Sequence, residues 1–166
     1  MDKKVSELLN EQINKEFYSA YLYLDMSNFY RDRGLDGFAN WYDVQAREEM
    51  DHGMKIYDFM HDNDQTVTFE AIAKPNKKYE NLDCPLKAAL EHERYVTSLI
   101  HNIYAAAHAV DDFRTMQFLE WFIKEQCEEE KNASDLIKKY ELFAKDGGMG
   151  LYHLDTELRG RKYSSE

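Results

Sequence analysis

One glutamate stands near the middle of each of four long segments with helical apolar periodicity, at Glu16, Glu49, Glu93 and Glu129. A buried, ionised carboxylate costs several kcal/mol unless it is paired. No Lys or Arg lies on the same faces near that level, so the four groups must take up protons or bind cations. His52 follows Glu49 by three residues, which puts two ligands on one helical face. Oxygen ligands with one imidazole favour redox-capable iron, and zinc or manganese would also fit.

Each of these residues alone has a plainer interpretation. A single glutamate such as Glu16 on an apolar face usually reaches the rim of the core, and a single histidine such as His52 is usually a hydrogen-bonded core residue. Four carboxylates at matching depth, with a histidine one turn on, favour a dinuclear metal site instead. Two divalent ions bridged by Glu49 and Glu93 would neutralise the four carboxylates.

Helices must position these residues, and the periodicity predicts four, at roughly 5–32, 36–62, 83–110 and 114–144. A short fifth helix is expected at about 151–159. The buried face of the fourth helix is predicted to comprise Leu119, Phe122, Gln126, Glu129, Ala133, Leu136, Tyr140 and Phe143. Leu151, Leu154 and Leu158 form an apolar stripe on the fifth helix, which is too short to be stable alone.

The connections predict the topology. Short turns at 31–36 and 111–113 make the first and second helices antiparallel neighbours, and likewise the third and fourth. The polar segment 63–83 contains Pro75 and no sustained helical pattern. Some 20 extended residues reach about 65 Å, whereas a helix of ~27 residues is about 40 Å long. We therefore predict an all-α, single-domain chain (1–166): a four-helix bundle with one long crossover between the second and third helices.

Composition narrows the range of partners. The chain has 166 residues and a formal net charge of −11, which disfavours binding to nucleic acids and to acidic membranes. No apolar run approaches the ~18 residues of a membrane span, and the first residues resemble no export signal. Cys84 and Cys127 form no CxxC and no zinc-site spacing. They are interpreted as reduced thiols of a cytoplasmic protein.

The chain contains five short motifs: Asn10–Glu16, Glu48–His52, His92-Glu93, Glu125–Lys131 and the tail sequence Gly150-Leu151-Tyr152. Together these motifs resemble those of the non-haem bacterial ferritins. The resemblance implies a hollow homo-oligomeric cage of 24 subunits, with the fifth helix at a fourfold axis. It also implies ferroxidase activity, in which Fe(II) is oxidised by O₂ or H₂O₂ and the product is stored as a ferric mineral.

The resemblance also implies residue roles. Glu16, Glu49 and His52 look like the first iron site. Glu49 and Glu93 look like bridging or second-site ligands, with Glu129 completing the second iron. The resemblance further implies that Gln126 helps to hold oxygen or water. A third iron site is implied at Glu48, Glu125, Glu128 and Glu129. Tyr23 and Trp121 match nearby aromatic residues that could supply an electron. A run such as Glu128–Glu130 also has the plainer interpretation of a solvated face.

The chain differs from two related families, and two other functions compete with that of a ferritin. Bacterioferritins carry a second Glu-x-x-His where this chain reads Glu129-Glu130-Lys131-Asn132, and no haem is predicted although Met50 stands at their haem-ligand position. Rubrerythrins add a four-cysteine iron site, which two cysteines cannot build. A monomeric di-iron oxygenase and a helical scaffold or metal buffer without turnover remain the competing functions.

Overall fold

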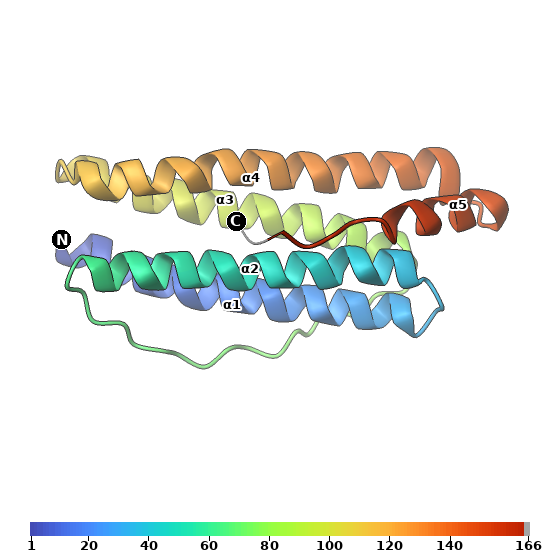
Figure 1. The fold of residues 1–166 in the computed structure, drawn as a ribbon, viewed down its shortest axis with the longest axis horizontal. Coiled ribbons are helices and arrows are strands. Elements are labelled where there is room, and N and C mark those ends of the chain that lie inside the picture. Colours follow the sequence, from blue (N-terminus) through green and yellow to red (C-terminus); the bar gives the residue numbers. More distant parts are fainter. Residues whose placement is uncertain (165–166) are drawn as a thin grey trace.

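Four long helices form a bundle in the computed structural model, which describes residues 1–164 (Figure 1). They are α1 (Lys3–Arg31), α2 (Asp36–Asp62), α3 (Asp83–Ala109) and α4 (Phe113–Lys139), followed by a π-helical turn η1 (Tyr140–Ala144) and a short helix α5 (Gly148–Leu158). Helix α1 packs against α2, and α3 packs against α4. Helices α2 and α3 run in the same direction (Figure 1), so the predicted all-α bundle is confirmed.

Local sequence explains where the helices begin and end. The Asp2 carboxylate accepts hydrogen bonds from the backbone N–H groups of Lys4 and Val5, which caps the N-terminus of α1. Asp112 caps α4 in the same way through the backbone N–H of Thr115. Between α1 and α2, Gly34 has φ 71°, a left-handed conformation that glycine adopts without steric cost. These signals fix both short antiparallel turns.

The crossover between α2 and α3 runs along the outside of the bundle as an extended chain (Figure 1). Side chains of α1 hold it in place. The Asn10 amide donates to the Thr68 carbonyl over 3.0 Å and accepts from the Thr68 N–H over 2.8 Å, and the Asn14 amide donates to the Glu70 and Ala71 carbonyls. The crossover carries the chain back to the end of the bundle where α2 began, as predicted.

The hydrophobic core is divided into two clusters by a layer of buried polar side chains. One cluster includes Tyr30, Phe38 and Leu136 and lies toward α5. The other includes Leu9 and Ile103 and lies toward the opposite end. The layer between them contains Gln12, Glu16, Ser19, Gln45, Glu49, His52, Glu93, Gln126 and Glu129. Polar groups are costly to bury, so this layer is where the fold departs from simple apolar packing.

Helix α5 packs on the subunit's own bundle. Leu154 and Leu158 are buried there, and the Asp155 carboxylate accepts from the backbone N–H groups of Gly37 and Phe38 over 2.8 and 3.1 Å. Asp155 thereby caps α2, whose own N-cap residue makes no side-chain cap. The stripe of α5 therefore finds its apolar partner within the chain, before any assembly.

Phe143 was predicted to lie on the buried face of the fourth helix, and this prediction is wrong. Phe143 is 66% exposed, whereas Ala144 is 1% exposed. The chain winds as a π-helix from Tyr140, and the Lys145 N–H donates to the Tyr140 carbonyl over 2.9 Å. This wider turn places one extra residue in the helix, so the buried positions shift from Phe143 to its neighbour.

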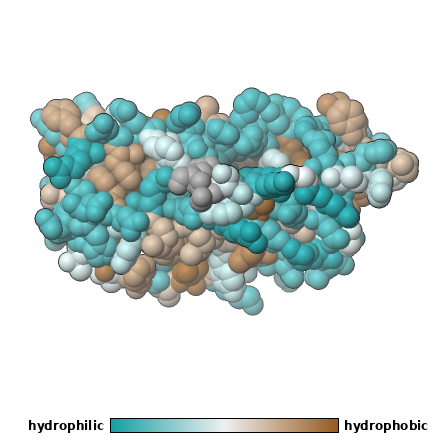
Figure 2. Space-filling model, in the orientation of Figure 1, coloured by the Kyte–Doolittle hydropathy of each residue, from teal (hydrophilic) through white to brown (hydrophobic). Residues whose placement is uncertain are grey.

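The outer surface is largely hydrophilic, with separate hydrophobic patches, as the face in Figure 2 shows. Along the described part of the chain, no helix is both long enough and apolar enough to cross a membrane.

Candidate metal centre

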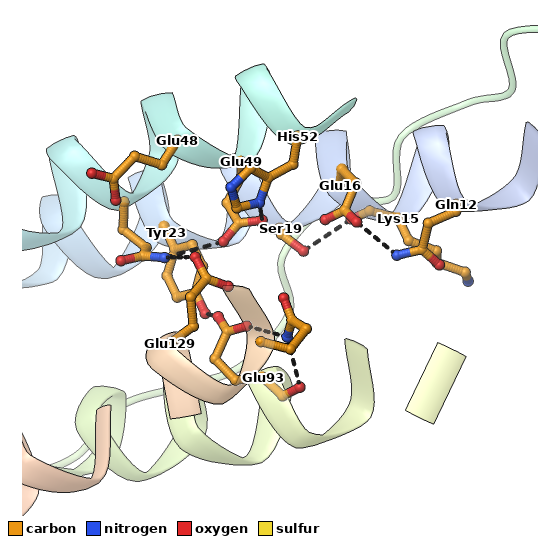
Figure 3. Close-up of polar contacts among 12 residues, drawn as sticks. Gln12, Lys15, Glu16, Ser19, Tyr23, Glu48, Glu49, His52, Glu93 and Glu129 are labelled. Carbon is orange, nitrogen blue, oxygen red and sulfur yellow. Dashed lines mark hydrogen bonds and ion pairs between the residues drawn. The ribbon is translucent and has the colours of Figure 1, made fainter. Parts of the chain in front are cut away.

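All four helices contribute a carboxylate to the polar layer, and the side chains point toward one another in the interior (Figure 3). The exposed fractions of Glu16, Glu49, Glu93 and Glu129 are 1%, 1%, 3% and 6%, and that of His52 is 1%. The spacing of these residues along amphipathic helices explains their depth, because each lies on the same face as the leucines and isoleucines around it.

Two groups of potential ligands share one residue. Glu16, Glu49 and His52 form one group, and Glu49, Glu93 and Glu129 form the other. Within each group, one ligand atom from each residue lies within 4.8 Å of the others. Glu49 belongs to both groups, so its two oxygens could join two metal ions. Carboxylates with one imidazole are ligands suited to iron.

Glu16 lies at the α1 side of the centre with an incomplete set of hydrogen bonds. Its Oε1 accepts from the Gln12 amide over 2.8 Å, whereas its buried Oε2 has no hydrogen-bond partner in the described structure. Burial, followed by the negative charge of Glu49, raises the pKa of Glu16 to about 8. A cation beside Oε2 would supply the missing partner.

Glu49 differs from the other three glutamates. Its Oε2 lies 3.4 Å from Nδ1 of His52, and its Oε1 accepts from the Gln45 amide over 3.2 Å. Burial alone would raise the pKa of Glu49, but the contact with His52 and the Gln45 hydrogen bond outweigh it, and the pKa is lowered. The shared residue of the two groups is thus held as the anion.

Glu93 is tied to α1 and α4. The Tyr23 hydroxyl donates to its Oε1, and the Gln126 amide donates to its Oε2 over 3.1 Å and to its backbone carbonyl over 3.2 Å. Burial raises the pKa of Glu93 to about 7 in spite of these hydrogen bonds. Tyr23 and Gln126 therefore both act directly on a carboxylate of the second group.

Glu129 completes the second group. Its Oε1 accepts from the Gln45 amide over 2.7 Å, and among the described residues nothing forms a hydrogen bond with its buried Oε2. Burial first, and then the charges of Glu49 and Glu93, raise its pKa well above the ordinary value. Two of the four glutamates thus present unsatisfied buried oxygens, and this donor set fits a pair of divalent cations.

The residues that the resemblance associates with a third iron lie in different surroundings. Glu125 forms a further group with His52 and Glu129. Glu48 lies on the same stretch of α2, and its carboxylate is paired with Arg161 of the C-terminal tail. Glu128 is exposed and belongs to none of the ligand groups found in residues 1–164. The structure thus brings Glu125 toward the centre but not Glu128.

The sequence analysis did not identify Gln12 and Arg161, which form hydrogen bonds with side chains at or beside the centre. Gln12 lies one turn before Glu16, a spacing that could have indicated its hydrogen bond. Arg161 reaches Gln45 and Glu48 from a segment more than a hundred positions away, and nothing in its neighbours signals this. Trp121 was predicted to lie near the centre, and its ring centroid is 5.4 Å from that of His52.

A four-helix bundle with a buried carboxylate and histidine centre defines a class of metal-binding bundle proteins. The family model described as a ferritin-like domain matches residues 6–143. A bacterial non-heme ferritin of Staphylococcus saprophyticus is 36% identical over 163 residues, covering 98% of this chain and 97% of that protein. A probable bacterial non-heme ferritin-like protein of Haemophilus influenzae is 34% identical over 158 residues, with 95% of each chain covered.

Solved structures agree with these relatives. A form of the Archaeoglobus fulgidus ferritin that was engineered to be closed superposes with a TM-score of 0.95 at 39% identity, covering 99% of each chain. The open-pore ferritin of the same archaeon superposes with a TM-score of 0.94 at 40% identity, covering 98% of this chain and 99% of that one. The chain belongs to the ferritin family, whose members are iron-storage proteins.

Proposed function

We propose that each subunit is a ferroxidase that binds two Fe(II) ions as substrate and oxidises them. The observation that carries this proposal is the sharing of Glu49 between two buried ligand groups. Glu16 and His52 would complete one ion's ligands, and Glu93 and Glu129 those of the other. Hard carboxylate ligands stabilise Fe(III) relative to Fe(II) and so favour the loss of an electron from each ion.

The electrons go to O₂ or H₂O₂. Two Fe(II) ions lose one electron each; O₂ takes up these two electrons with two protons to give H₂O₂, or H₂O₂ takes them up with two protons to give two waters. Residues of this chain orient the ligands during the reaction: Gln126 and Tyr23 hold Glu93, while Gln45 holds Glu49 and Glu129. We propose that Gln126 also helps to hold oxygen or water, and that Tyr23 or Trp121 supplies a further electron.

We propose that the ferric product is stored as a mineral inside a hollow cage of 24 subunits. The ferritin-family relatives support assembly, and so does an apolar groove of about 700 Å³ on the outer face of α1 and α2. Tyr21, Leu24 and Met50 line this groove and are 49%, 50% and 45% exposed in the single subunit. Exposed apolar side chains gathered in one place are typical of protein interfaces.

A third, weakly held iron beside the first two is proposed from Glu48, Glu125 and Glu129, with Glu128 at its exposed rim; it is weakly held because Glu48 is already paired with Arg161. No haem and no nucleic-acid partner are proposed, and a cytoplasmic location remains a prediction from composition.

Two measurements test the proposed function. Anaerobic Fe(II) titration should saturate at about two tightly bound ions per subunit, and addition of O₂ should then consume oxygen as the ions are oxidised. Particle mass should report a 24-subunit assembly. A monomer that consumes oxygen would favour the di-iron oxygenase, and binding without oxygen consumption would favour the metal buffer. Glu93→Gln serves as the variant that should lose oxidation.

A further inference from the structure

The C-terminal tail places an arginine beside the proposed metal centre. After α5 the chain runs back along α2 (Figure 1). The Asn40 amide fixes this path by donating to the carbonyls of Leu158 and Arg161 over 3.1 and 3.0 Å. The Arg161 guanidinium lies 4.2 Å from the centroid of the Trp41 ring, and its Nη1 donates to the Trp41 carbonyl over 3.2 Å. The side chain of Arg161 is only 18% exposed, so the arginine is built into the subunit.

Arg161 pairs with a carboxylate of the proposed third site. Its Nη2 donates to Oε2 of Glu48, whose side chain is 14% exposed. A partly buried pair of opposite charges is screened less by solvent than a surface pair. The guanidinium thus already engages the carboxylate oxygen of Glu48 that the proposed third site would use.

Arg161 also orients Gln45. Both Nη1 and Nη2 donate to Oε1 of Gln45 over 3.0 Å. A guanidinium has donors only, so the amide must turn its oxygen toward Arg161 and its NH₂ toward the centre. That NH₂ donates to Glu129 over 2.7 Å and to Glu49 over 3.2 Å. The contacts form a continuous path from the tail to both ligand groups.

We propose that Arg161 is a positioning residue that limits each subunit to two tightly bound metal ions, because its guanidinium takes the place of a third cation at Glu48 while it aligns Gln45 with Glu49 and Glu129. This inference rests on the proposed dinuclear site. It makes the C-terminal tail a determinant of how many ions the centre holds, and removal of the guanidinium takes away the ion pair that competes with a metal ion for Glu48.

Zinc binding to the assembled, metal-free protein tests this proposal without any oxidation step. Equilibrium dialysis against Zn(II), followed by metal analysis, should give about two tightly bound ions per subunit for the unchanged protein and about one more for Arg161→Ala. Lys162→Ala is the matched control, because Lys162 is the adjacent cation of the same tail but is exposed. It should bind the unchanged number, and Arg161→Lys, which keeps a positive charge beside Glu48, should restore that number.

The double variant Arg161→Ala/Glu48→Gln tests whether the Glu48 carboxylate binds the additional ion, since that ion should then be lost. Equal stoichiometry in Arg161→Ala and the unchanged protein would overturn the proposal, and so would an additional ion that persists without the Glu48 carboxylate. Failure of the dinuclear site itself is distinguishable, because the unchanged protein would then lack two zinc ions that depend on Glu93. Circular dichroism and particle mass verify that every variant folds and assembles.

Discussion

The imidazole of His52 and the carboxylate of Glu49 meet one helical turn apart on α2, with Nδ1 3.4 Å from Oε2. This contact makes Glu49 the exception among the four glutamates, because its pKa is lowered, whereas burial raises the pKa of Glu16, Glu93 and Glu129. The metal-free centre therefore combines one carboxylate that favours its charge with three that favour a proton.

The shared position of Glu49 predicts unequal effects of two substitutions. His52→Ala removes a ligand from one group and should slow the rapid phase of Fe(II) oxidation by on the order of tenfold or more. Glu49→Gln removes a ligand from both groups and should abolish the tight binding of the second ion. Stopped-flow absorbance and anaerobic titration measure the two effects. Equal losses in both variants would contradict the sharing of Glu49.

Glu93→Gln should stabilise the metal-free protein at pH 8 and have little effect at pH 5. The folded-state pKa of Glu93, about 7, is raised above the ordinary value of 4.5. The unfolded chain therefore releases its proton first as the pH rises, and stability is lost between about pH 4.5 and 7. One pKa unit corresponds to 1.36 kcal/mol, so the gain at pH 8 reaches up to about 3 kcal/mol.

Chemical denaturation of the metal-free variant at the two pH values measures this gain. The same variant should lose rapid Fe(II) oxidation, so improved stability and lost activity are expected together. A normal oxidation rate in Glu93→Gln would show that Glu93 is not an iron ligand, and the assigned dinuclear site would then be wrong.

Metal loading should release protons near neutral pH. Burial raises the pKa of Glu16 to about 8 and that of Glu93 to about 7, so both hold protons for much of the time at pH 7 in the metal-free state. A bound cation must displace these protons, and affinity should fall as the pH is lowered from 8 to 6. Anaerobic Fe(II) titration in buffers of different ionisation enthalpy counts the protons by calorimetry. The double variant Glu16→Gln/Glu93→Gln should release fewer protons for each ion that it binds. An unchanged number of protons per bound ion would contradict the prediction.

Gly37→Ala should detach α5 from the start of α2. A Cβ atom on Gly37 would lie 1.7 Å from the backbone carbonyl oxygen of Asp155, which cannot move without displacing α5. The loss of the Asp155 cap and of the packing of Leu154 should cost about 1–3 kcal/mol. Thermal denaturation of the metal-free protein measures the loss. Gly34→Asn is the control: its Cβ meets open space, and Asn tolerates φ 71°, so it should melt near the unchanged protein.

The sequence predicted those parts of the fold and of the candidate centre that depend on helical spacing. Glu49 and His52 share a face because they are three residues apart, and a short turn at Gly34 makes α1 and α2 neighbours. Phe143 was misplaced because a π-helical turn breaks the regular spacing on which the prediction relied. The contacts of the C-terminal tail could not be predicted from the sequence for a different reason. The position of Arg161 depends on how α5 docks and where Asn40 holds the backbone, and neither leaves a periodic pattern.

The paired hydrogen bonds between Asn10 and Thr68 have a consequence for the dynamics of the crossover. Thr68 lies outside any helix, yet its N–H and carbonyl are both engaged by one side chain of α1. Its amide hydrogen should exchange with solvent much more slowly than those of the exposed crossover residues that follow it. The anchored stretch from Thr68 to Ala71 thus divides the crossover into a short loop and a longer one, and the two should fluctuate independently of each other.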